Sequence, residues 1–208
     1  MNKLFTLLGA GLLLGAISCN NQHEVIPPPL QVADLECSCN ATVDGIAYEY
    51  VDSCTYDNTK TITTGTSTAR YSTKVSQPII QGAGFTEGIE LEMRTLEWVD
   101  DGSNFPTVEE WKAYFENNLN PDYYISDALN SNGVSIKWTD PNGDLWQSDT
   151  TLFCSGIDFV YTTMASDSDQ TGNYMKFRAI FNCPLIKFDN SDTVCLENGV
   201  MKTSFKRE

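Results

Sequence analysis

Cysteines and carboxylates are the groups with which this 208-residue chain could do chemistry, because it has only one histidine. That residue, His23, lies near the amino terminus, so Ser-His-Asp and Cys-His catalytic arrangements and histidine metal sites are excluded from the rest of the chain. Hydrolysis of a glycoside needs only two carboxylates, and 28 acidic residues leave that chemistry open without singling out a pair. The sequence therefore assigns no catalytic residue.

Six of the seven cysteines lie beyond residue 30, and they are Cys37, Cys39, Cys54, Cys154, Cys183 and Cys195. An even number without any Cys-x-x-Cys spacing favours disulfides over a metal site. Cys37 and Cys39 are two residues apart, so on a strand they face the same side and should bond to different partners. A turn around Asp189 would place Cys183 opposite Cys195 across an antiparallel pair, which predicts one bridge. The pairing of the other four stays open.

Two tryptophans, Trp138 and Trp146, form a candidate ligand-stacking pair in the segment KWTDPNGDLWQ. Pro141, Asn142 and Gly143 fit a type I turn closed by a left-handed glycine, which makes a three-residue hairpin. Counting outward from this turn places the two indoles opposite each other on one face. They could form an exposed platform for a sugar ring or a core pair under a helix, and the usual burial of large aromatic side chains favours the core.

Two segments carry part of a motif for a metal or a phosphate group. The spacing of three residues is similar to that of Ca²⁺ ligands: Asp140, Asn142 and Asp144. Counted from Asp140, however, Gly143 is at the fourth position, whereas an EF-hand loop has its glycine at the sixth. The glycines of QGAGFTEG lack the lysine and the following helix of a phosphate-binding loop. The sequence therefore predicts no metal and no cofactor.

Alternating β-prone segments would position these groups. Asp44-Gly45 in ATVDGIAYEYV is a hairpin signal. In GIELEMRTLEWV the apolar positions are odd-numbered up to Met93 and even-numbered from Leu96, which predicts a bulge near Thr95. A later segment places one apolar face on alternate residues: Met175, Phe177, Ala179, Phe181, Cys183 and Leu185.

One segment departs from the β pattern. Thr107 followed three residues later by Glu110 is a capping box, and Trp111 and Phe115 share one helical face. These features predict a single helix over about 107–118. Many strands with one helix indicate a mainly β fold, an antiparallel β-sandwich or barrel-like domain.

The amino terminus has the order of an export signal. Lys3 precedes the apolar run Leu4–Ile17, which is shorter than the roughly 20 residues that span a membrane. Small residues then lead to Cys19, and the tetrapeptide AISC resembles the lipobox of bacterial lipoproteins. This resemblance implies a signal peptide over 1–18, acylation of Cys19 and attachment to a membrane through that lipid. A plain secretory signal or an uncleaved anchor is the alternative.

The polar and then proline-rich segment 19–34 is typical of a flexible tether, which leaves 35–208 as a single β-rich domain. Together with the lipobox, the segments ATVDGIAY, SIKWTDPNGDLWQSD and KFRAIFNCPL…CLENGVMKTSF resemble small lipoproteins of Bacteroidota that belong to families defined only as domains of unknown function. The resemblance implies an outer-membrane location, facing the periplasm or the cell exterior. Its motifs are turns and strand ends, so it transfers no catalytic residue.

The net charge and the composition limit the classes of partner and function that the protein can have. With 28 acidic and 13 basic residues the formal charge is −15, which argues against nucleic acid and against an anionic membrane surface as partners. Two function classes remain: a non-catalytic binding or structural module for a glycan or protein, and a glycan hydrolase acting through carboxylates. The absence of histidine from the predicted domain and the anchored, disulfide-bearing β architecture favour the first class.

Overall fold

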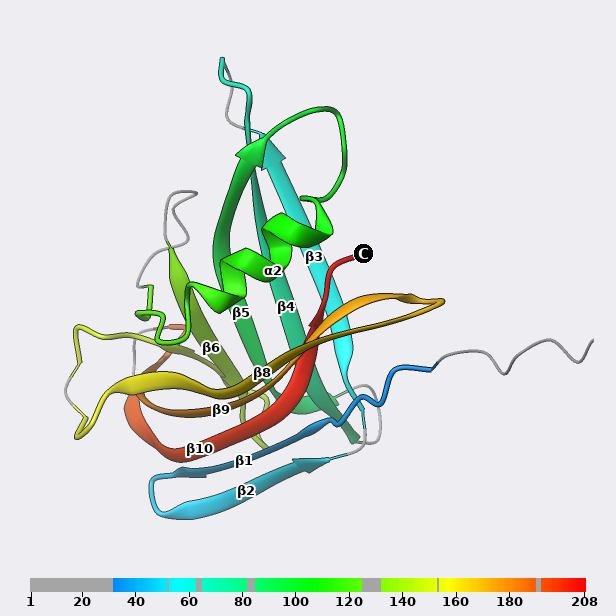
Figure 1. Ribbon diagram of the computed structural model, residues 1–208. Coiled ribbons are helices and arrows are strands. Elements are labelled where there is room, and N and C mark those ends of the chain that lie inside the picture. The colour runs from blue at the N-terminus through cyan, green and yellow to red at the C-terminus, as the bar shows by residue number, and fades with distance from the viewer. Residues whose placement is uncertain are drawn as a thin grey trace, which may run out of the picture. The chain divides into compact units, whose positions relative to one another are not determined.

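The computed structural model describes residues 32–51, 53–62, 65–81, 85–124, 132–152, 154–189 and 192–208. The predicted signal peptide, Cys19 and most of the predicted tether lie outside these residues. The described part is mainly β with one short helix, and its strands pair antiparallel (Figure 1). The predicted fold class is confirmed.

Ten strands of the described residues form one sheet. They are β1 Ser38–Val43, β2 Ile46–Val51, β3 Thr55–Ile62, β4 Thr68–Gln81, β5 Phe85–Val99, β6 Gly133–Thr139, β7 Leu145–Ser148, β8 Asp158–Asp169, β9 Gly172–Lys187 and β10 Thr193–Lys206. Their order across the sheet is β2-β1-β10-β9-β7-β6-β5-β4-β3, and β8 also pairs with β9. The long β9 accommodates both neighbours, because residues 172–182 pair with β8 and 185–187 pair with β7.

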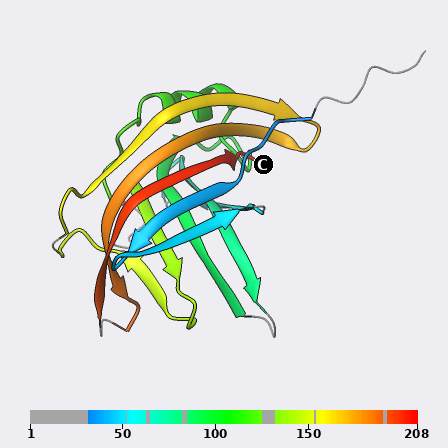
Figure 2. The ribbon, with the colours of Figure 1, turned by 90° about the horizontal axis from the view of Figure 1, so that it is seen from below.

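The sheet curls into a half-barrel, so that the side formed by β8, β9, β10, β1 and β2 faces the side formed by β3–β6 (Figures 1 and 2). The two sides meet where β10 lies against β3 and β4 without joining their ladders. Side chains span this seam: Tyr56 Oη lies 3.1 Å from Ser204 Oγ, and Tyr71 Oη donates to the Arg207 carbonyl at 2.6 Å. The curl therefore encloses one face of the sheet as the core.

The enclosed face is packed with aromatic and aliphatic side chains. The six alternate residues of β9 predicted to share one face are all buried, which confirms that pattern. The rings of Phe177 on β9 and Phe205 on β10 have centroids 4.8 Å apart. The ring of Phe181 lies over Gly199, where an added Cβ would come within 2.4 Å of the ring. Glycine at that position is therefore required by close packing.

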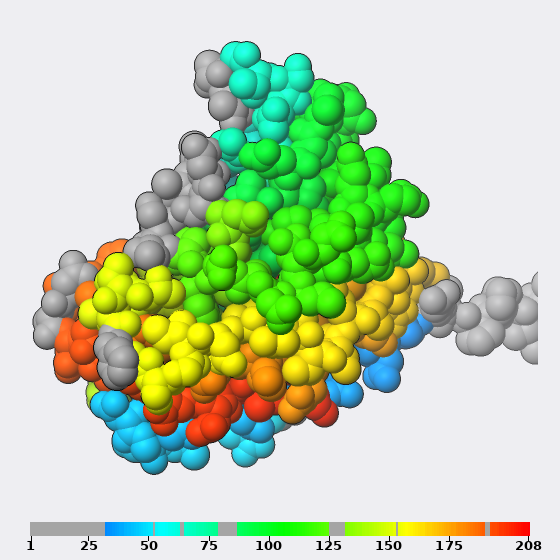
Figure 3. Space-filling view, turned by 60° about the vertical axis from the view of Figure 1, so that its left-hand side comes forward, coloured from blue at the N-terminus to red at the C-terminus, as the bar shows by residue number. Residues whose placement is uncertain are grey.

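The helix α2 (Val108–Glu116) has the predicted capping box. The Glu110 N–H donates to Thr107 Oγ1 at 3.2 Å, and the Thr107 N–H donates back to the Glu110 carboxylate at 2.8 Å. Trp111 and Phe115 are buried, and the Phe115 ring stacks on Phe205 with centroids 5.2 Å apart. In the space-filling view the green helical segment lies against the yellow β8 (Figure 3). Within the described ranges no helix has the length and apolar character to cross a membrane.

Two local predictions about strand geometry are also confirmed. Asp44 and Gly45 form a two-residue hairpin turn with positive φ angles of 49° and 79°, as a type I′ turn requires. On β5, Arg94 and Thr95 together face only Ser72 of β4, which is a β-bulge at the predicted place. This bulge turns the residues after it to the opposite phase and so returns their apolar side chains to the core.

Candidate functional site

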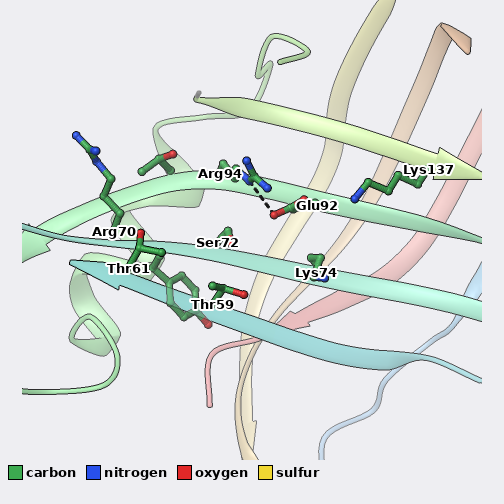
Figure 4. Close-up of a pocket in the computed structure, with 10 residues that line it drawn as sticks. Thr59, Thr61, Arg70, Ser72, Lys74, Glu92, Arg94 and Lys137 are labelled. Atoms are coloured by element: carbon green, nitrogen blue, oxygen red, sulfur yellow. Dashed lines mark hydrogen bonds and ion pairs between the residues drawn. The ribbon is translucent and has the colours of Figure 1, made fainter. Parts of the chain in front are cut away.

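A groove on the outer face of β3–β6 gathers the polar side chains with the clearest binding chemistry (Figure 4). Its cavity measures about 200 Å³, and we call it the cationic groove. Its lining residues are Thr59, Thr61, Arg70, Tyr71, Ser72, Lys74, Glu92, Arg94, Thr95 and Lys137. Side chains alternate between the two faces of a strand, so on β4 Tyr71 is buried in the core whereas Arg70 and Ser72 are partly exposed outside.

The charge of this lining differs from that of the whole chain. Four of the 13 basic residues line the groove: Arg70, Lys74, Arg94 and Lys137. Glu92 is the one acidic residue in the lining. The lining therefore holds four cations and one carboxylate on a chain with a formal charge of −15, and each cation is paired with a carboxylate in or beside the groove. An anionic ligand would bind there by replacing the exposed carboxylate partners.

Glu92 and Arg94 form a fixed pair at one wall of the groove. Arg94 Nε donates to Glu92 Oε1 at 2.8 Å, and Tyr124 Oη donates to Glu92 Oε2 at 2.7 Å. The Arg94 guanidinium also lies 4.8 Å from the centre of the Tyr124 ring. Burial by itself would raise the pKa of Glu92, but the hydrogen bonds from Arg94 and Tyr124 and the charges of Arg94 and Lys137 lower it overall. Glu92 is therefore an ionised carboxylate that holds Arg94 in place.

The other three cations make ion pairs at the rim. Arg70 Nε lies 2.6 Å from Glu97 Oε1, and Lys74 Nζ lies 3.2 Å from Asp57 Oδ2. Both acidic partners are exposed, with about half or more of each side chain in contact with solvent. Exposed ion pairs contribute at most about 1 kcal/mol, so these cations can exchange their partners for an anionic ligand at little cost.

The third of these rim cations, Lys137, lies 3.7 Å from Glu90 Oε1. Burial would lower the pKa of Lys74, but the charges of Glu90, Asp57 and Glu92 and the hydrogen bond with Asp57 raise it overall. Lys74 therefore keeps its charge at neutral pH. Lys74 extends from β4 and Lys137 from β6, and Figure 4 shows Lys137 beside Glu92.

The predicted tryptophan pair is present but is not a ligand platform. Trp138 and Trp146 are direct register partners with ring centroids 6.0 Å apart, and they are 4% and 6% exposed. Trp138 packs edge-on against Tyr48 and donates its Nε1–H to Tyr50 Oη at 2.8 Å, while Tyr50 donates to the buried Glu87. The core interpretation is confirmed and the stacking platform is wrong. The pair is covered by aromatic residues of β2, not by the helix as expected.

The turn between these tryptophans has the predicted three-residue form. The Asp140 N–H donates to the Asp144 carbonyl at 3.0 Å, and Gly143 has a φ of 91°. The Asp140 carboxylate accepts hydrogen bonds from the N–H groups of Asn142 and Asp144 and from Trp146 Nε1. The Asp140 carboxylate therefore stabilises the turn through these hydrogen bonds. Among the described residues, no group of three or more His, Cys, Asp or Glu side chains is arranged to hold a metal ion.

The predicted Cys183–Cys195 bridge is wrong. The disulfides are Cys37–Cys54, which joins the start of β1 to the start of β3, and Cys154–Cys195. Free, buried thiols are present at Cys39 and Cys183. Burial raises the pKa of each of these thiols to about 12, so both are unreactive at neutral pH. The expectation that Cys39 would also bond to a partner is therefore wrong as well.

A shift of one residue in register explains the wrong bridge. A turn centred on Asp189 would pair Cys183 with Cys195, but the observed turn pairs Cys183 with Leu196 and Cys195 with Pro184. Because side chains alternate along a strand, this shift turns Cys195 to the face opposite Cys183. On that face Cys195 bonds to Cys154, which follows β7.

No motif in the sequence singles out the cationic groove. Its basic residues are spread from position 70 to position 137, and the ladder brings Lys137 opposite Glu90 across β5 and β6. The only local signal was the alternation of polar and apolar residues along β4 and β5. Comparison of the chain with protein-family models, with curated proteins and with solved structures found no match.

Proposed function

We propose that this protein is a lipid-anchored, non-catalytic binding module at the outer membrane, and that its cationic groove binds an anionic ligand. The observation that carries the proposal is the gathering of four basic side chains in one groove of a strongly acidic chain. The hydroxyl groups of Thr59, Thr61 and Ser72 lie in the same lining and add hydrogen-bonding partners for a polar ligand. The lipobox-like AISC segment supports the anchored location.

The state of Glu92, the one carboxylate in the lining of the groove, favours binding over hydrolysis at this site. A glycosidase needs one protonated carboxylic acid with a raised pKa beside a second carboxylate. Glu92 has a lowered pKa, and both of its oxygens accept hydrogen bonds from Arg94 and Tyr124. Asp140 is occupied by its own turn and by Trp146. Glu92 is therefore not poised to donate a proton to a leaving group.

The binding proposal is tested by calorimetry on the detergent-solubilised mature protein. Hexagalacturonate should bind, whereas a neutral glucose hexamer should not, and affinity should fall as ionic strength rises from about 0.01 M to about 1 M and the Debye length shrinks from about 30 Å to about 3 Å. The double variant Lys74→Gln, Lys137→Gln should lose at least about tenfold in affinity, since one charge-assisted hydrogen bond contributes about 1.5–3 kcal/mol.

Lys112→Gln on helix α2 is the matched control and should bind like the wild type. Equal binding of the acidic and neutral hexamers, or full affinity in the double variant, would contradict the proposal. Release of shorter products from the acidic hexamer would instead support the hydrolase.

The anchor is tested separately with Cys19→Ser. This variant should lose the acyl mass and either remain uncleaved or become soluble, because the thiol that carries the lipid is gone. Mass spectrometry and detergent partitioning measure both properties. A variant that is processed normally and still enters the detergent phase would show that the lipobox interpretation is wrong.

A further inference from the structure

The cationic groove continues into a second cavity on the same face of the sheet. Lys74 and Lys137 line both cavities, so the two are contiguous across β4, β5 and β6. The second cavity measures about 340 Å³, which lies within the range of about 300–1,000 Å³ usual for small-molecule sites. It adds Pro78, Gly88 and Leu145 to the lining, so we call it the apolar extension.

The joined groove is elongated along β4. Arg70 lies at one end and Pro78 at the other, and eight residues of extended strand correspond to about 27 Å. In the lining of the apolar extension, Gly88 pairs directly with Pro78 across β4 and β5. A Cβ at Gly88 would come within 2.4 Å of the Gln77 carbonyl oxygen, so the backbones there are already in close contact.

We infer that the ligand of this groove is an acidic oligosaccharide of several sugar units that lies along β4. This inference rests on the function proposed above for the same groove. Carboxylates or sulfates of the sugar chain meet Arg70, Lys74 and Lys137. The less polar faces of its rings lie over the apolar extension, against Pro78 and Leu145. The lining extends along β4 from Arg70 to Pro78, so the ligand is held by several weak subsites in series.

The backbone of the groove favours a glycan over a peptide. An extended peptide gains affinity from hydrogen bonds to the free edge of a sheet. The groove instead lies on the face of the sheet, where β4 and β5 have ladder partners on both sides. On this face a ligand can form hydrogen bonds only with side chains. Hydroxyl groups suited to the hydroxyls of a sugar are supplied by Ser72, Ser76 and Thr139.

Calorimetry with galacturonate oligomers of increasing length tests this inference on the mature protein in detergent. Affinity should rise about tenfold or more from the dimer to the hexamer as additional subsites fill. Leu145→Glu places a negative charge in the apolar extension and should lower hexamer affinity to about the level of the dimer. Ile157→Glu is the matched control, because both side chains are 37% exposed.

The outcomes separate the inference from the proposed function. Absence of binding by the hexamer would overturn both. Binding of the dimer as tightly as the hexamer, or no effect of Leu145→Glu, would overturn the extended site and leave the anion-binding groove standing. Equal affinity for a hexaglutamate peptide would overturn the assignment to glycans.

Discussion

Removal of the Cys154–Cys195 disulfide should destabilise the domain more than removal of Cys37–Cys54. The two bridges have sequence separations of 41 and 17 residues. In the chain-entropy description, closing a loop of 41 residues reduces the entropy of the unfolded chain enough to contribute about 4 kcal/mol at 25 °C, against about 3 kcal/mol for 17 residues. The expected difference of about 1 kcal/mol is measurable in one protein under one set of conditions.

The measurement is urea unfolding of Cys154→Ala, Cys195→Ala and of Cys37→Ala, Cys54→Ala, with the free energy extrapolated to water. Each double replacement removes both thiols of one bridge, so no new pairing of its cysteines can form. A reductant should destabilise the wild type by removing both bridges and should affect each variant less.

Cys183→Ala serves as the control for the pairing itself. This variant should lose stability through lost packing of a buried side chain, but it should keep the full response to reductant because Cys183 is a free thiol. Loss of that response in Cys183→Ala, or equal stability of the two bridge variants, would refute the reasoning.

Three further predictions concern packing and charge. Trp138→Ala should cost about 3–5 kcal/mol in unfolding free energy, and acrylamide should barely quench wild-type fluorescence because all four tryptophans are buried; strong quenching would contradict their burial. Because the pKa of Glu92 is lowered in the folded state, its ionised form stabilises the protein above pH 4.5, and that stabilisation is lost as pH falls through the folded pKa. The unfolding free energy of Glu92→Gln should therefore fall less steeply on acidification than that of the wild type. An equal fall in the two proteins would contradict this. Gly199→Ala should cost about 1–3 kcal/mol by overpacking, and Phe181→Leu in the same chain should recover part of that loss; strict additivity of the two changes would contradict the contact.

Features set by a few neighbouring residues could be predicted from the sequence. The capping box of Thr107 and Glu110 and the turn that pairs Trp138 with Trp146 depend on residues within a short stretch of chain. The bulge at Thr95 was visible because a change of alternation within one strand has few other causes.

Features set by distant contacts could not be predicted in the same way. The Cys183–Cys195 bridge was wrong because one extra residue in the turn after β9 reverses the face of the first side chains of β10, as far as the bulge between Leu196 and Gly199. The cationic groove depends on the pairing of β5 with β6 and on the direction of the curl, which places Arg70 of β4 and Lys137 of β6 in one lining. No local pattern in the sequence specifies that juxtaposition.

Lysine footprinting tests most directly whether the cationic groove is the binding site. The mature protein would be acetylated with and without saturating hexagalacturonate, and the extent of modification at each lysine measured by mass spectrometry. We predict that the ligand protects Lys74 and Lys137, which line the groove, and leaves Lys112 on helix α2 unchanged. Protection of Lys112 with full modification of Lys74 and Lys137 would contradict the assignment of the site.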